Sequence, residues 1–104
     1  MVKIIDNKQF ETEVKNAPGV CLVDFFATWC GPCTMQAKVL EEYQNEKKEN
    51  LEIIKVNVDE LGDLADKYNI VAVPTLMVFK EGMLVYKHEG YLDLESLRNK
   101  IESM

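Results

Sequence analysis

Hydrophobic residues occur along this chain in short continuous runs, separated by segments in which they recur at helical spacing. A run of strand length predicts a strand that is covered on both faces, because such a strand carries apolar side chains at consecutive positions. The runs are Val20 to Phe26, Leu51 to Val58, Leu76 to Lys80 and Met83 to His88, and a shorter one, Val2 to Ile5, precedes them. Glu81 and Gly82, between the last two runs, are typical of a hairpin turn.

The segments between these runs carry apolar residues three and four positions apart, which predicts amphipathic helices. Asp6 and Gln9 form a capping-box pattern at the start of the first helix, which Pro18-Gly19 ends. The second helix begins near Pro32 and covers Thr34 to Lys48. The predicted apolar stripes are Phe10, Val14 and Ala17, then Met35, Val39, Leu40 and Tyr43, then Leu61, Leu64, Ala65 and Tyr68, and finally Leu94, Leu97 and Ile101.

Strands and helices follow one another in the order β-α-β-α-β-α-β-β-α. Alternation of strands with helices predicts parallel strand pairs, and the final hairpin adds an antiparallel pair. We therefore expect an α/β fold in which a central mixed β-sheet of about five strands is flanked by four helices. No linker, internal repeat or low-complexity segment divides the 104 residues, so we expect one domain over residues 1–104.

The composition argues against several classes of function. The chain has 18 acidic and 12 basic residues, a formal net charge of -6, and no basic patch that would attract nucleic acid or an anionic membrane surface. No apolar run approaches the roughly 18 residues of a membrane span, and the first residues lack the apolar segment of a signal peptide. We therefore expect a monomeric cytoplasmic protein that binds neither nucleic acid nor membranes.

Two of the three cysteines lie in Trp29-Cys30-Gly31-Pro32-Cys33, between the run that ends at Phe26 and the second helix. Such a pair can form a redox-active disulfide, supply half of a zinc site, or close a purely structural bridge. Zinc prefers four ligands, and only Cys21 and His88 could complete the set, neither at ligand-like spacing. A structural bridge over so few residues would stabilise the fold little. We therefore favour thiol–disulfide exchange and expect no metal.

The position of the pair suggests a role for each sulfur. Cys30 directly precedes the predicted second helix, where unpaired backbone N–H groups and the positive end of the helix dipole stabilise a thiolate. Cys30 is therefore the expected nucleophile, and Cys33, more covered within the first turn, is the expected resolving thiol. Gly31 lets a partner's backbone approach, and Pro32 stiffens the loop without losing a helical hydrogen bond.

Two charged residues interrupt the predicted buried strands. Asp24 lies within the run Val20 to Phe26, where an ionised carboxylate costs several kcal/mol unless it is neutral, paired or hydrogen-bonded. It is either the partner of a backbone group or a carboxyl that accepts and returns the Cys33 proton through a water molecule. Lys55, on the next predicted strand, is either a neighbour of Asp24 or a lysine whose charged end reaches solvent.

The segments Val-Asp-Phe-Phe-Ala, Trp-Cys-Gly-Pro-Cys, Lys-Val-Asn-Val-Asp and Val-Pro-Thr occur in this order and at the spacing seen in the thioredoxin family, which the chain resembles over essentially its whole length. The resemblance implies a thioredoxin fold. The roles that it implies are Cys30 as attacking thiolate, Cys33 as resolving thiol, Asp24 as buried acid and Lys55 as its neighbour. Pro74, which could otherwise be an ordinary proline at a strand entrance, matches the family's cis-proline, so a cis Val73-Pro74 bond is expected beside the disulfide.

The same resemblance implies a docking surface for substrate proteins, on which an extended substrate segment lies antiparallel to the Val73-Pro74 segment. The residues expected to form it are Trp29, Gly31, Pro32, Val73, Pro74 and Gly90. Four positions depart from the family's pattern without removing a catalytic group. They are Thr34 in place of Lys or Arg, Lys38 in place of a helix-kinking proline, Phe26 in place of a tryptophan, and Tyr91 in place of a smaller residue.

The expected function is that of a general protein-disulfide reductase that cycles between a dithiol and a disulfide. Thioredoxin reductase would supply its electrons, disulfide-containing proteins would be its substrates, and the Cys30–Cys33 disulfide would act with no added cofactor. Gly31-Pro32 lacks the charged or histidine residue that an oxidant or isomerase prefers between its cysteines. The competing hypothesis is a binding module in which the cysteines are incidental, against which the intact pair, Asp24 and Pro74 argue.

Overall fold

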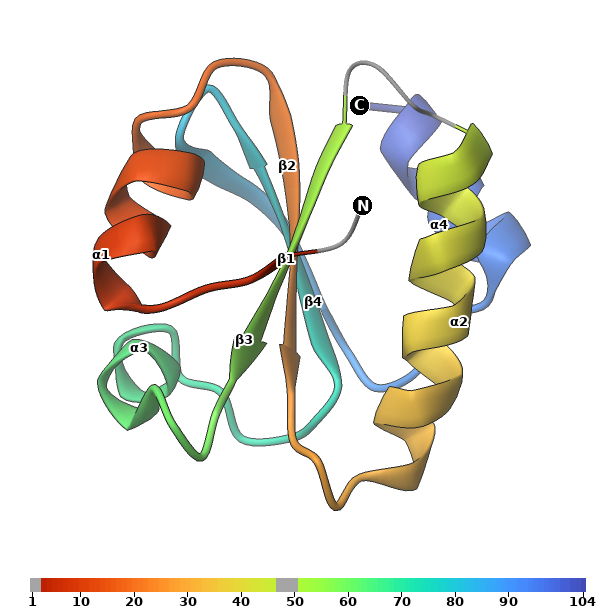
Figure 1. Cartoon of the computed structure of the whole chain (residues 1–104). Coiled ribbons are helices and arrows are strands. Elements are labelled where there is room, and N and C mark those ends of the chain that lie inside the picture. The colour runs from red at the N-terminus through yellow and green to blue at the C-terminus, as the bar shows by residue number, and fades with distance from the viewer. Residues whose placement is uncertain (1–2, 47–50) are drawn as a thin grey trace.

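The computed structural model describes residues 3–46 and 51–104, and within them the order of strands and helices is the predicted one (Figure 1). The elements are β1 (Lys3–Ile4), α1 (Asn7–Phe10), η1 (Glu11–Lys15), β2 (Val20–Phe26), α2 (Gly31–Glu46), β3 (Leu51–Asn57), α3 (Gly62–Lys67), β4 (Thr75–Lys80), β5 (Met83–Glu89) and α4 (Leu94–Glu102). Val2 of the first predicted strand, and Lys47 and Lys48 of the second predicted helix, lie outside the described residues.

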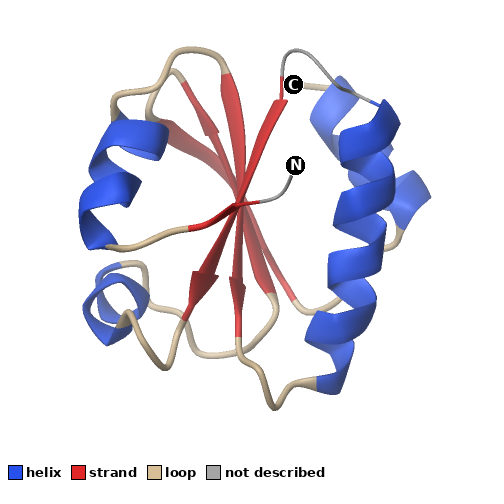
Figure 2. Ribbon diagram, in the orientation of Figure 1, coloured by secondary structure: helices blue, strands red, loops and turns tan. Residues whose placement is uncertain are grey.

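The strands form a five-stranded mixed sheet in the order β1-β3-β2-β4-β5. β2 lies in the middle, parallel to β3 and antiparallel to β4, while β4 and β5 form the predicted hairpin. Helices cover both faces of the sheet, with α1 and α3 on one face and α2 and α4 on the other (Figure 1 and Figure 2). The predicted α/β fold with a central mixed sheet is therefore confirmed.

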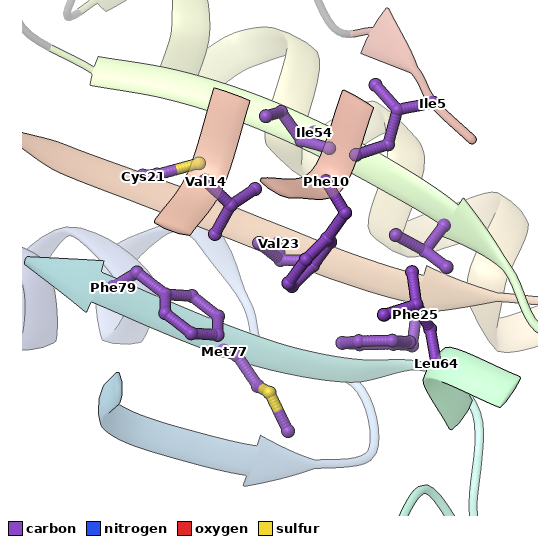
Figure 3. Packing of buried hydrophobic residues seen from close by; sticks show 11 residues of the cluster. Ile5, Phe10, Val14, Cys21, Val23, Phe25, Ile54, Leu64, Met77 and Phe79 are labelled. Carbon is purple, nitrogen blue, oxygen red and sulfur yellow. The ribbon is translucent and has the colours of Figure 1, made fainter. Parts of the chain in front are cut away.

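β2 is buried along nearly its whole length because both faces of the sheet are covered. Cys21, Val23 and Phe25 belong to the core on the side of α1 and α3 (Figure 3), whereas Leu22 belongs to the core on the side of α2 and α4. Burial of each large apolar side chain stabilises the fold by about 1.5–3 kcal/mol. The two cores together hold β2, and with it the loop that leaves its carboxyl end.

The first helix begins as predicted and ends differently. Asp6 Oδ1 accepts a hydrogen bond from the Gln9 backbone N–H at 2.8 Å, and Gln9 Oε1 accepts one from the Asp6 N–H at 3.0 Å, so the capping box is confirmed. The last part, η1, is a π-helical turn closed by a 3.0 Å hydrogen bond from Asn16 N–H to the Glu11 carbonyl, which the sequence pattern did not predict. Ala17 therefore lies beyond the helix.

The apolar stripe predicted for α2 was wrong at its first position. Met35 is 55% exposed, and Gln36 is fully buried in its place. Gln36 stands at helical spacing from the buried residues Leu40 and Tyr43, so it faces the sheet even though it is polar. The hydrophobic pattern predicted that Met35 is buried, whereas the helix places the neighbouring Gln36 at the buried position.

The β4–β5 hairpin packs against the segment that follows η1. Its turn places Glu81 and Gly82 at positive φ, and the Glu81 N–H donates to the Gly19 carbonyl at 2.9 Å. A Cβ atom at Gly82 would overlap the main-chain carbonyl oxygen of Lys15. Gly82 therefore meets two requirements, a left-handed backbone and a close approach to another main chain.

We expect Gly82→Ala to destabilise the fold more than Gly19→Ala by about 1–3 kcal/mol, because overlap with the Lys15 main chain adds to the cost of positive φ. Both glycines have a φ of +80°, but a Cβ at Gly19 would meet no atom of the described residues within 4 Å. Gly19→Ala is therefore the matched control. Urea unfolding of the two variants measures the difference, and equal losses of stability would contradict the close approach.

Candidate active site

A disulfide joins Cys30 and Cys33 at the point where β2 is followed by α2. The two Cα atoms lie 5.2 Å apart, and α2 begins at Gly31, so Cys30 directly precedes the helix as predicted. Both cysteines pack with Phe26 and Ala27 in a small apolar cluster at the carboxyl end of β2. The predicted pairing of these two sulfurs is therefore confirmed.

The first turn of α2 supplies the electrostatic environment of Cys30. The backbone N–H of Cys33 donates to Cys30 Sγ at 3.1 Å. The first turn carries no acidic side chain, so the positive end of the helix dipole is not offset locally. Both features favour a thiolate on Cys30 over one on Cys33 once the disulfide is opened. Cys33 is also slightly less exposed than Cys30, at 3% against 6%.

The Val73-Pro74 segment lies directly beside the disulfide. Its peptide bond is cis, as the resemblance implied, and the Val73 carbonyl oxygen lies 3.6 Å from Cys30 Sγ. The Pro74 carbonyl accepts a hydrogen bond from the Gly90 N–H at 2.8 Å. Gly90 is thereby joined to the Val73-Pro74 segment, which itself adjoins the disulfide.

The expected docking residues are not equally accessible. Trp29, Gly31 and Pro32 are exposed, Val73 and Gly90 are half-buried, and Pro74 is buried. Trp29 is held in place by a hydrogen bond from its Nε1 to Asp59 Oδ2 at 2.9 Å. Sequence reasoning missed the role of Asp59, although this residue ends the Lys-Val-Asn-Val-Asp segment that the resemblance quoted.

Asp24 is fully buried on the strand face that carries Leu22 and Phe26. Neither of its carboxylate oxygens has a hydrogen-bond partner among the described residues, which argues against a backbone partner. Burial raises the pKa of this carboxyl to about 7, an effect that the positive charge of Lys55 partly opposes. Asp24 can therefore gain or lose a proton near neutral pH.

Lys55 lies opposite Asp24 in the β2–β3 register. It is half-buried, and its Nζ lies 4.3 Å from the centre of the Phe26 ring. Phe26 in turn packs against the two cysteines. The strand register and the effect of the Lys55 charge on the Asp24 pKa support the first of the two alternatives for Lys55, a neighbour of Asp24.

The remaining candidates lie away from this site. Cys21 is buried on the opposite face of β2 from Asp24, and His88 lies on the edge strand β5. Within residues 3–46 and 51–104 no group of three or more His, Cys, Asp or Glu side chains could hold a metal ion. None of the helices described there is long and apolar enough to cross a membrane.

Comparison with known proteins gives a consistent result. The family model described as Thioredoxin matches residues 1–103. A thioredoxin of Listeria monocytogenes serovar 1/2a is 44% identical over 97 residues, which cover 93% of this chain and 92% of that protein. A thioredoxin of Staphylococcus aureus strain N315 is 43% identical over 102 residues, which cover 98% of this chain and 95% of that protein.

The raised pKa of Asp24 predicts how stability depends on pH. The folded protein holds this proton up to about pH 7, whereas the unfolded chain releases it near the ordinary pKa of about 3.9. Between these values the folded state binds more protons, so stability falls as the pH rises through this range. We expect Asp24→Asn to raise the free energy of unfolding by about 2–4 kcal/mol at pH 8 and by less towards pH 4.

Urea unfolding at several pH values measures this effect. The exposed Asp66, changed to Asn, is the matched control and should shift stability little at every pH. A loss of stability in Asp24→Asn at pH 8 would show that the native carboxylate is ionised and well compensated.

Proposed function

The chain belongs to the thioredoxin family and is a protein-disulfide oxidoreductase that uses its own Cys30–Cys33 disulfide, and on this premise we propose that it works as a reductase with Cys30 as the attacking sulfur. One observation carries the assignment. Cys30 directly precedes α2, and the backbone N–H of Cys33 donates to its sulfur. A helix start that stabilises negative charge on one of two cysteines makes that cysteine the nucleophile.

In the first step the Cys30 thiolate of the reduced protein attacks one sulfur of a substrate disulfide. A bond forms between Cys30 and that sulfur, the substrate S–S bond breaks, and the second substrate sulfur leaves as a thiolate that takes up a proton. The Cys33 N–H that lies 3.1 Å from Cys30 Sγ favours the attacking thiolate before this step. The product is a mixed disulfide between Cys30 and the substrate.

In the second step Cys33 resolves the mixed disulfide. Its thiol gives a proton to Asp24 through an intervening water molecule, and the resulting thiolate attacks Cys30 Sγ. The Cys30–Cys33 bond forms, the bond from Cys30 to the substrate breaks, and the substrate leaves with both of its sulfurs reduced. A pKa of about 7 suits Asp24 to accept and return a proton at neutral pH, and Lys55 keeps part of the population ionised.

The substrate segment would lie in an extended conformation next to Val73-Pro74, antiparallel to it. Trp29, Gly31 and Pro32 offer exposed surface next to the two cysteines in the sequence, and Gly90 is hydrogen-bonded to Pro74. The Val73 carbonyl, 3.6 Å from Cys30 Sγ, would place the substrate's main chain so that its sulfur reaches Cys30. The support for this binding mode is geometric, because Trp29, Gly31 and Pro32 are exposed and the Val73 carbonyl lies beside Cys30 Sγ.

Two features support the reducing direction. Gly31-Pro32 places no charged or histidine side chain between the cysteines, and thioredoxins have potentials near about -270 mV. We therefore assign the electron supply to a thioredoxin reductase and the setting to the cytoplasm. The protein would act as a monomer, residues 1–104 as one domain, with the disulfide as its only redox group. A binding module without redox activity is the alternative that the following experiment tests.

We expect Cys30→Ser to lower the rate of insulin reduction to that of dithiothreitol alone, because the attacking sulfur is lost. Cys33→Ser should lower turnover, and after reduction and removal of dithiothreitol it should accumulate a covalent mixed disulfide with insulin, since resolution by Cys33 is blocked. Cys21→Ala removes the third cysteine and serves as the control, with turbidity rates close to those of the unchanged protein. Non-reducing electrophoresis detects the mixed disulfide.

Equal turbidity rates in the unchanged protein and Cys30→Ser would reject the enzymatic function. A mixed disulfide that accumulates in Cys30→Ser and not in Cys33→Ser would instead reverse the roles of the two sulfurs.

A further inference from the structure

Gln36 links α2 to the segment between β5 and α4. Its Nε2 donates to the Leu92 carbonyl at 3.0 Å, and its Oε1 accepts from the Leu92 N–H at 2.8 Å. The side chain is fully buried. The donor and the acceptor of the Gln36 amide are therefore both hydrogen-bonded to the main chain of Leu92, as between paired residues of two strands. These two bonds fix the position of Leu92 relative to α2.

The same segment is anchored at its other end. The Gly90 N–H donates to the Pro74 carbonyl at 2.8 Å, and Gly90 has a φ of +95°, which favours glycine. The Leu92 side chain also packs against the core on the side of α2 and α4. Residues 90–92 are thus tied to the cis-proline segment on one side and to the helix of Cys33 on the other.

Tyr91 stands between these two anchors with its side chain 39% exposed. Its neighbour Gly90 bonds to Pro74, and Val73 contacts Cys30 Sγ, so Tyr91 is held next to the surface on which the substrate segment would lie. A phenol ring offers a broad apolar face at a small cost in side-chain entropy. Trp29, next to Cys30 in the sequence, is also exposed and adds apolar area.

We propose that Tyr91 contacts the substrate and favours protein disulfides with an apolar residue beside the attacked cysteine, and that Gln36 is the positioning residue that holds Tyr91 in place. The inference rests on the proposed function, because it concerns the substrates of that reaction. Gln36 acts through the main chain of Leu92 and does not touch the substrate. Without it the segment would have to be ordered when a substrate binds, which weakens binding.

Kinetics of insulin reduction test both residues. We expect Tyr91→Ala and Gln36→Leu each to raise KM for insulin about five-fold or more, with kcat within about two-fold. The double variant should not exceed the larger single effect, since both changes remove the same contact. Reduction of 5,5'-dithiobis(2-nitrobenzoic acid), which is too small to need the Tyr91 contact, should change far less than that of insulin.

Gln44→Leu is the matched control for Gln36→Leu. Gln44 is also buried in α2, and its Nε2 donates to the Leu51 carbonyl at 3.1 Å, but it lies near the opposite end of the helix from the disulfide. The Gln44→Leu variant should have a lower free energy of unfolding in urea and an unchanged KM for insulin. A rise in KM equal to that of Gln36→Leu would show a general loosening of the fold and would overturn the positioning role.

Two disulfide-linked peptides that differ only in Leu or Ser beside the cysteine test the specificity. The unchanged protein should have the lower KM for the Leu peptide, and Tyr91→Ala should bring the two KM values together. An unchanged ratio in Tyr91→Ala would overturn the assignment, and this variant decides the matter even if Gln36→Leu fails to fold. If the unchanged protein reduces neither insulin nor the small disulfide, the proposed function fails; if it reduces both and the variants keep its KM, only this inference fails.

Discussion

The burial of β2 on both faces is the constraint on which the rest of the structure depends. Its side chains alternate between two cores, and its neighbours β3 and β4 satisfy its main chain on both sides. A strand held in this way ends at a fixed point, and α2, which packs on the same sheet through Leu40 and Tyr43, begins at a fixed point. The disulfide lies where the short connection between these two rigid elements enters α2. The positions of its two sulfur atoms are therefore fixed by β2 and α2.

The same burial conflicts with the charge on Asp24. A carboxyl in the middle of β2 loses its hydration, and the single positive charge of Lys55 across the sheet compensates for only part of that loss. The protein keeps a carboxyl where an apolar residue would pack without this cost. The proposed proton transfer would account for this, because the environment that destabilises the ionised carboxylate also raises the pKa of Asp24 to about 7.

Much of the fold and of the site could be predicted from the sequence, because the decisive signals are local. Apolar runs predicted the long strands, and the position of Cys30 before a helix predicted its electrostatic environment. The cis bond before Pro74 was accessible only through the resemblance, since spacing does not distinguish it from an ordinary proline. Gln36 and Asp59 were missed because their importance depends on Leu92 and Trp29, which only the folded chain brings to them. The π-helical turn at Glu11–Lys15 likewise has no local signature.

The donor that favours charge on Cys30 is a main-chain N–H, whereas the residues around the docking surface act through side chains. A substitution can replace the side chain of Trp29, Tyr91 or Gln36, whereas any change of side chain other than to proline leaves the Cys33 backbone amide in place. The main-chain contribution to thiolate stability therefore depends on the helix itself, whereas the proposed selection of protein substrates would depend on a few replaceable side chains. Relatives with this fold can therefore keep the same thiol–disulfide exchange and differ in the proteins that they reduce.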